Sequence, residues 1–167
     1  MTEMMKDSAT PSPIYGLKTD IQPRIEDYDL FGHLNNVRYA SYLEAARLHV
    51  FAELLGGDIS RYNALTAYLE IDYRQPIPFG IPVSVVVSFS RIGTKSLNMP
   101  FQIVHRQDPQ TIFALGNVSQ VFMDLKARSS CPIPEDVREK MEAVMAGRSS
   151  DLGIQDQVEL AVAATHR

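Results

Sequence analysis

The stretch from Asp27 to Asn36 concentrates the side chains of this sequence that could do chemistry. It reads Asp27-Tyr28-Asp29-Leu30-Phe31-Gly32-His33-Leu34-Asn35-Asn36 and is followed at once by a helical pattern. Asn35 or Asn36 is suited to cap that helix, because its side-chain oxygen can accept from a free amide of the first turn. Carboxylates then lie beside the positive end of a helix. Such a pair can activate a water or attack a carbonyl while backbone amides stabilise the oxyanion.

A long helix, expected over residues 36–55, must position this stretch. Two apolar stripes run along it, one formed by Tyr39, Tyr42, Leu43, Ala46, Val50 and Leu54, the other by Val37, Ala40, Leu48, Phe51 and Leu55. A helix that is apolar around most of its circumference is a buried helix. Glu44 falls between the stripes, so we interpret it as a buried carboxylate with satisfied hydrogen bonds. Gly56 and Gly57 end the pattern.

Four segments alternate apolar and polar residues as strands do, and a weaker pattern precedes them. The four span residues 65–74, 81–89, 97–103 and 111–126, with Pro100 interpreted as an edge position, and the weaker one spans 17–26. Short turns between them predict antiparallel pairing, and one apolar face per strand needs a cover. Only the helix over 36–55 is long enough to supply it. The predicted fold class is therefore α+β, an antiparallel sheet wrapped around one central helix.

The last of these strands breaks its own pattern. Asn117 and Ser119 fall in the same row as the apolar residues Phe113, Leu115, Val121, Met123 and Leu125. Two polar residues in an apolar row indicate a bulge, the wall of a polar pocket or a contact between subunits. These explanations stay open at the level of sequence.

A single domain of ordinary size accounts for the 167 residues. We predict a flexible lead-in over residues 1–16, the domain over 17–147, and a mobile tail over 148–167 that lacks a clear packing face. Inside the domain, Pro134 starts a second helix, because proline is suited to the start of a helix and Glu135 and Asp136 follow in its first turn.

Composition excludes several classes of protein. The net charge of −4 and the absence of a basic run argue against a nucleic-acid partner. Cys131 is the single cysteine, which excludes an internal disulfide and fits a reducing cytoplasm. No apolar run reaches the length of a membrane span, and the N-terminus lacks the apolar segment of a signal peptide. We therefore expect a cytoplasmic protein without a membrane partner.

The acidic stretch resembles the signature of hot-dog-fold thioesterases, the 4-hydroxybenzoyl-CoA thioesterase family with its acyl-CoA and acyl-carrier-protein relatives. The resemblance covers roughly residues 17–146. Its matching positions are Asp27-x-Asp29-x-x-Gly32-His33-x-Asn35-Asn36-x-x-Tyr39-x-x-Tyr42-x-Glu44-x-Ala46-Arg47, then Tyr73-Arg74-x-Pro76-Ile77-x-Phe79-Gly80, Ile92-Gly93-x-Lys95-Ser96 and Ile133-Pro134-Glu135. The fold that this resemblance implies, a sheet wrapped around a long helix, agrees with the pattern of the segments.

The resemblance also implies a reaction, the hydrolysis of an acyl thioester. Asp29 matches the catalytic acid and would act as nucleophile or as general base. The backbone amide of Asn36 matches the group that polarises the thioester oxygen. Gly32 would allow close approach of backbone or substrate, while His33 and Asn35 would orient a water or Asp29.

Substrate contacts are implied at three further positions. Tyr39 would form part of the substrate wall or of the core. Lys95, with Ser96 beside it, matches a cationic position near the CoA phosphates or is a plain turn lysine. Gly93 and Thr94 stand where the benzoyl-type enzymes have adjacent arginines, so thioesters borne by a carrier protein stay open beside CoA. The family further implies at least a homodimer with a shared groove. We expect neither a metal nor a cofactor.

Other chemistries fit the sequence worse. It contains no Gly-x-Ser-x-Gly elbow, no glycine-rich phosphate loop, no His-Glu-x-x-His metal motif and no Asn-Pro pair of the kind that hot-dog hydratases have. The main alternative is a hot-dog module that binds acyl-CoA without hydrolysing it. Release of thiol from an acyl-CoA panel would separate the two functions.

Overall fold

The computed structural model describes residues 14–160, so residues 1–13 of the predicted lead-in and 161–167 of the predicted tail lie outside it. No helix of the described residues is long and apolar enough to span a membrane. The elements are β1 (Tyr15–Ile21), α1 (Asn36–Leu54), β2 (Ala64–Tyr73), β3 (Val83–Ser88), β4 (Arg91–Ile92), β5 (Ser96–His105), β6 (Asp108–Asp124), β7 (Ser129–Ser130), α2 (Glu135–Met145) and β8 (Gln157–Glu159), with single 3-10 turns at Ile25–Asp27, Ile59–Arg61 and Ser149–Leu152.

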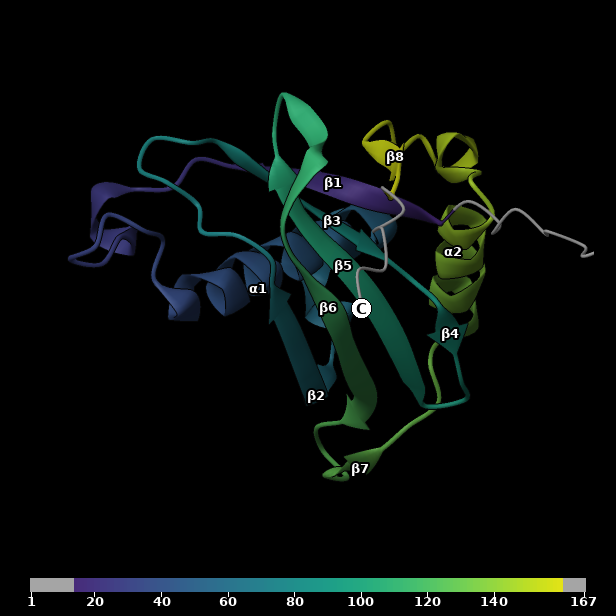
Figure 1. Cartoon of the computed structure of the whole chain (residues 1–167). Helices are drawn as coiled ribbons and strands as arrows, with labels where there is room; N and C mark the ends of the chain where they lie inside the picture. Colours follow the sequence, from purple (N-terminus) through teal and green to yellow (C-terminus); the bar gives the residue numbers. More distant parts are fainter. Residues whose placement is uncertain (1–13, 161–167) are drawn as a thin grey trace, which may run out of the picture.

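The strands form one sheet in the order β2-β6-β5-β3-β1-β8, with β4 added to β5 and β7 to β6. All strand pairs are antiparallel. The long helix α1 lies against one face of this sheet, and α2 stands beside the end of β1 (Figure 1). The predicted α+β class and the antiparallel sheet around one long helix are confirmed.

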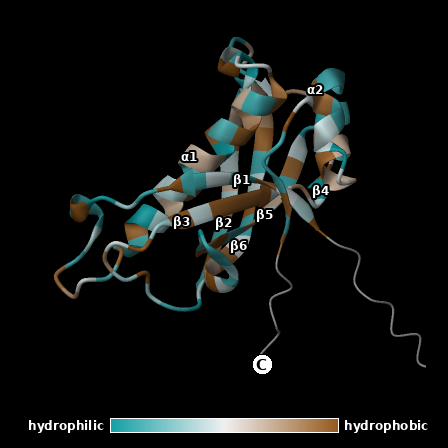
Figure 2. Cartoon of the chain, turned by 90° about the horizontal axis from the view of Figure 1, so that it is seen from above, coloured by the Kyte–Doolittle hydropathy of each residue, from teal (hydrophilic) through white to brown (hydrophobic). Residues whose placement is uncertain are grey.

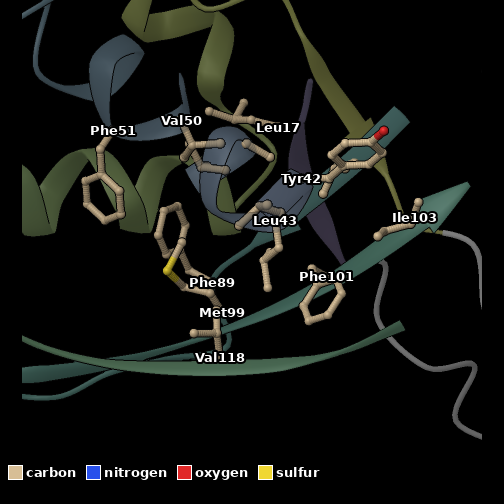
Figure 3. Packing of buried hydrophobic residues seen from close by; sticks show 14 of the residues in the cluster. Leu17, Tyr42, Leu43, Val50, Phe51, Phe89, Met99, Phe101, Ile103 and Val118 are labelled. Carbon is tan, nitrogen blue, oxygen red and sulfur yellow. The ribbon is translucent and has the colours of Figure 1, made fainter. Parts of the chain in front are cut away.

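The core lies between α1 and the sheet. Side chains of α1 meet side chains of the central strands there (Figure 3). Figure 2, coloured by hydropathy, shows hydrophobic bands on the strands of the sheet against which α1 lies. All six residues of the first predicted stripe are buried, together with Phe51 and Leu55 of the second.

The prediction that α1 is buried around most of its circumference is wrong on one side. Val37 is 72% exposed and Leu48 is 43% exposed. Glu44 is exposed as well, so the buried carboxylate predicted there is also wrong. These residues recur at helical spacing with Ser41, which places them on one face of α1 that neither the sheet nor α2 covers.

Most of the apolar row predicted for the last strand does not face the core. Its first member, Phe113, is buried in the core at the point where the pairing of β5 with β6 shifts its register, between Ile103 and Val104. Val118, Gln120 and Phe122 are buried, whereas Asn117 and Ser119 alternate with them and so lie on the outer face of the sheet. The hydroxyl of Ser119 donates to the side-chain oxygen of Asn98 at 2.9 Å on that face. The irregularity opposite them belongs to β2, between Thr66 and Tyr68.

The edge position predicted for Pro100 is also wrong, because β5 is an interior strand. It pairs with β6 on one side and with β4 and β3 on the other. Pairing with β4 includes Asn98, and pairing with β3 begins at Phe101. Pro100 lies between the residues that pair with β4 and those that pair with β3. A proline, which has no N–H to donate, therefore costs no hydrogen bond to either strand.

Past α2, residues 149–160 do have a packing face, contrary to the prediction. The strand β8 pairs with β1 and extends the sheet. Ile154 and Leu160 are buried, and Leu160 packs with Val86 and Val104 on the outer face of the sheet. The division into lead-in, domain and tail remains a prediction.

Candidate active site

A tight loop over residues 28–34 precedes α1 and is closed on itself. Tyr28 pairs with Leu34 through a β-bridge, and the amide of Asp29 donates to the carbonyl of His33 at 2.9 Å. Gly32 has a φ of 75°, in the left-handed region that favours glycine, so this turn explains why a glycine stands there. The loop is also attached to the segment after β2, because the Leu34 amide donates to Ile77 at 3.0 Å.

The carboxylate of Asp29 uses one oxygen to hold this loop. Its Oδ1 accepts from the backbone amides of Phe31 at 2.9 Å and His33 at 3.2 Å. Its Oδ2 accepts no hydrogen bond from the described residues, and the side chain is exposed. One oxygen of Asp29 is therefore anchored, and the other is available to a substrate or a water.

Asn35, the first of the two candidate caps, is the one that caps α1. Its side-chain oxygen accepts from the amide of Val37 at 3.0 Å. Asn36 is the first helical residue, and its amide donates to no acceptor among residues 14–160. A free amide at the positive end of a helix is a ready donor to an anion.

These groups line one cavity of about 310 Å³. Of the residues predicted from sequence, the cavity brings together Asp29, His33, Asn36 and Tyr39. Asn35 and Gly32 lie just outside it and shape its wall through the helix cap and the loop turn. The remaining lining residues are Leu34, Tyr73, Arg74, Gln75 and Pro76.

Sequence reasoning missed the wall that the end of β2 supplies. Tyr73 lies edge-on to Tyr39 with 5.0 Å between ring centroids, and its hydroxyl donates to the carbonyl of Asn36 at 3.4 Å. Arg74 is held by Asp72 at 2.8 Å. Gln75 donates to the carbonyl of Ile112 at 3.1 Å. The Tyr-Arg pair stood within a matching motif, but only the pairing of distant segments places it opposite Asp29.

Lys95 and Ser96 lie far from this cavity within the chain. Ser96 pairs with Val121 at one end of the sheet, whereas Tyr73 and Ala114 pair at the other end, beside Ile103. Ile103 lies seven positions after Ser96 along β5, a span of about 23 Å at the usual rise. The ammonium of Lys95 donates to the carbonyl of Ser130 at 3.2 Å. Within one chain, Lys95 and Asp29 therefore do not belong to the same site.

We expect Asn35→Ala to lower the free energy of unfolding by about 1 kcal/mol, because the Val37 amide loses its acceptor. Urea denaturation measures this difference. Asn36→Ala is the matched control, since the Asn36 side chain makes no hydrogen bond with residues 14–160. Equal losses in the two variants would contradict the assignment of Asn35 as the cap.

Comparison with known proteins identifies the family of this chain. The family model of the thioesterase-like superfamily matches residues 23–141. The long-chain acyl-CoA thioesterase FadM of Escherichia coli K12 is 24% identical over 137 residues, which cover 77% of this chain and 99% of FadM. The chain thus belongs to the thioesterase-like superfamily, as the resemblance implied.

Solved structures agree on the fold. A predicted thioesterase from Bacillus stearothermophilus superposes with a TM-score of 0.70 at 27% identity, covering 77% of this chain and 96% of its own. A thioesterase from Thermus thermophilus, solved in complex with coenzyme A and zinc, gives a TM-score of 0.69 at 28% identity, covering 78% and 94%. The fold is the hot-dog fold. Among the described residues of this chain, no group of three or more His, Cys, Asp or Glu side chains could hold a metal ion.

Proposed function

We propose that the protein hydrolyses acyl thioesters of CoA or of an acyl carrier protein, releasing a carboxylic acid and a thiol. One observation carries the proposal. Asp29, which has an unbonded carboxylate oxygen, and Asn36, which has a free backbone amide, line the same cavity at the start of α1. A thioester carbonyl between them meets an attacking or proton-accepting group on one side and an oxyanion donor on the other.

Two routes use this geometry. As general base, Asp29 takes a proton from water while the water oxygen bonds to the carbonyl carbon. As nucleophile, Asp29 bonds to that carbon itself, and water then hydrolyses the mixed anhydride. In both routes the carbonyl oxygen becomes an oxyanion beside the Asn36 amide. The carbon–sulfur bond breaks as the oxyanion collapses, and the thiolate takes up a proton. His33, in the cavity wall, would orient the water or Asp29.

CoA is the first candidate for the thiol. FadM is named for long-chain acyl-CoA, and the Thermus thermophilus relative was solved with coenzyme A. The acyl group would pack on the apolar part of the cavity wall, where Leu34, Tyr39 and Tyr73 lie. A carrier-protein thioester stays open because Gly93 and Thr94 replace the arginines of the benzoyl-type enzymes.

The active unit in this proposal is at least a homodimer that joins two β2 edges. One edge of β2 pairs with β6, and the other is unpaired within the described chain. Leu65, Tyr68 and Leu69 are exposed along β2, and Leu65 lines one hollow with Leu48 of the uncovered face of α1. A long apolar edge strand favours pairing with a second chain. When two β2 edges pair antiparallel, the start of β2 in one subunit lies beside the end of β2 in the other. The sheet end that carries Lys95 and Ser96 in one subunit then lies closer to the cavity of the other subunit, which favours a shared groove.

Replacing Leu69 with lysine is expected to convert the dimer to a monomer, because the charge would be buried in the joined edge. Size-exclusion chromatography with light scattering measures the mass. Leu125→Lys is the matched control, since this leucine is also exposed but lies beyond the end of β6. A wild-type protein that runs as a compact monomer would refute the dimer.

The function is tested by following thiol release from acyl-CoA substrates of increasing chain length, with one acyl-carrier-protein thioester included. Turnover of at least one of these substrates, strongly reduced when Asp29 is replaced by asparagine, is the expected result. The alternative function, a module that binds acyl-CoA without hydrolysis, predicts saturable binding with no thiol release beyond the uncatalysed rate. Wild-type protein that neither binds nor hydrolyses any of these thioesters would refute both.

A further inference from the structure

We propose that Asp27 is a positioning residue that sets the place of Asp29 relative to the Asn36 amide. The inference rests on the proposed function. Asp27 is 6% exposed and does not line the cavity of Asp29. It borders a separate hollow of about 460 Å³ on another side of the start of α1, with Arg24, Arg38 and Tyr42. Because it does not reach the reacting atoms, any effect on catalysis must act through its neighbours.

The Asp27 carboxylate contacts three donors from two segments. Its Oδ2 accepts from the hydroxyl of Tyr42 at 2.6 Å and from the backbone amide of Arg24 at 2.9 Å. Its Oδ1 lies 3.1 Å from Nε of Arg38. Arg38 and Tyr42 stand on the first two turns of α1, and Arg24 precedes the loop. One buried carboxylate thus joins the start of the loop to the start of the helix.

The backbone of Asp27 makes a second connection to the same helix. Its carbonyl accepts from the amide of Asn35, the helix cap, at 2.9 Å. The residues between them form the closed loop that carries Asp29, with its own bridge from Tyr28 to Leu34. These bonds hold the loop together and attach it to the helix at a base formed by Asp27 and Asn35. A shift of that base changes the separation of Asp29 from the Asn36 amide.

The groups around Asp27 keep its carboxyl ionised. Burial acts to raise the pKa of this carboxyl, but the hydrogen bonds from Tyr42 and Arg24 and the charge of Arg38 outweigh it, so the pKa lies below its usual value. Burial and the hydrogen bond to Asp27 raise the pKa of Tyr42 in turn. The pair is an ionised acceptor and a neutral donor throughout the neutral pH range. Asparagine at position 27 would place an amide group, itself a donor, against these donors.

Tyr42→Phe tests the connection by removing one hydroxyl and no packing. We expect kcat for thioester hydrolysis to fall about tenfold with KM within about twofold, because a small misplacement of a reacting group lowers the rate. Tyr62→Phe is the matched control, since it removes a hydroxyl bonded to Gln120 near the far end of α1. It should lower the melting temperature about as much while kcat stays within about twofold. Equal losses of kcat in both variants, or none in Tyr42→Phe, would overturn the inference.

A double-mutant cycle separates positioning from general stability. Asp27→Asn alone should lower kcat on the order of 10²-fold. In a protein that already carries Asp29→Asn, it should change the residual rate by less than about twofold, because the group that it positions is gone. Losses that multiply in full would mean that Asp27 acts independently of Asp29, and the inference would be wrong.

Hydrogen exchange gives a readout that does not need turnover. The hydrogen-bonded amides of residues 28–35 should exchange faster in Asp27→Asn and Tyr42→Phe than in wild type or Tyr62→Phe, because the base of the loop is loosened. Unchanged exchange in this segment would overturn the positioning role. A wild-type protein without thiol release would refute the proposed function instead, while the exchange experiment would still decide whether Asp27 holds the loop.

Discussion

Asp29→Asn is expected to lower kcat for thioester hydrolysis by a factor on the order of 10² to 10⁴. Asparagine keeps a side-chain oxygen that can accept from the amides of Phe31 and His33, so the loop should stay closed. The second oxygen, which is free in the wild type, becomes an amide group that can neither take a proton nor attack a carbonyl. Steady-state thiol release measures the loss, and circular dichroism confirms that the variant is folded.

Asp124→Asn is the matched control for this experiment. Asp124 is also exposed, and its Oδ1 also accepts from two amides of its own loop, those of Lys126 at 2.8 Å and Ala127 at 2.9 Å. The same substitution there should leave kcat within about twofold, because Asp124 does not line the cavity of Asp29. An Asp29→Asn variant with full activity would remove Asp29 from the mechanism.

The largest stability effect is expected at the centre of the core. Phe51→Ala should lower the free energy of unfolding by about 3–5 kcal/mol, because a buried phenylalanine is replaced by a cavity. Phe51 is fully buried, stacks on Tyr62 with 4.1 Å between ring centroids, and meets Phe89 and Phe122 edge-on. Equilibrium unfolding in guanidinium chloride measures the loss, which is a large part of the stability of an ordinary domain.

Phe31→Ala makes the same chemical change on the surface. Phe31 is 85% exposed, so its removal should change the free energy of unfolding by no more than about 0.5 kcal/mol. A Phe51→Ala loss as small as that of Phe31→Ala would mean that α1 is not packed against the sheet as described here.

The sequence by itself determined the kinds of elements and the residues with reactive groups. Helical spacing predicted α1 to within one residue, and alternation predicted β2, β3 and β5 closely, because both patterns are local consequences of backbone geometry. The stretch from Asp27 to Asn36 indicated a helix cap with acidic neighbours, and the structure has Asn35 as that cap. These inferences need only residues close together in the chain.

Tertiary structure alone decided which faces are covered and which distant residues meet. Alternation in β6 shows that its two faces differ, but it does not show which face is buried. The row that includes Val118 and Phe122 is buried because those side chains face α1. Tyr73 joins the cavity of Asp29, and Lys95 is separated from it, through strand pairings between segments far apart in the sequence. The connection from Asp27 to Tyr42 likewise depends on how the loop folds back on α1. Local pattern carries no information on such pairings, since they are decided by which surfaces can be buried together.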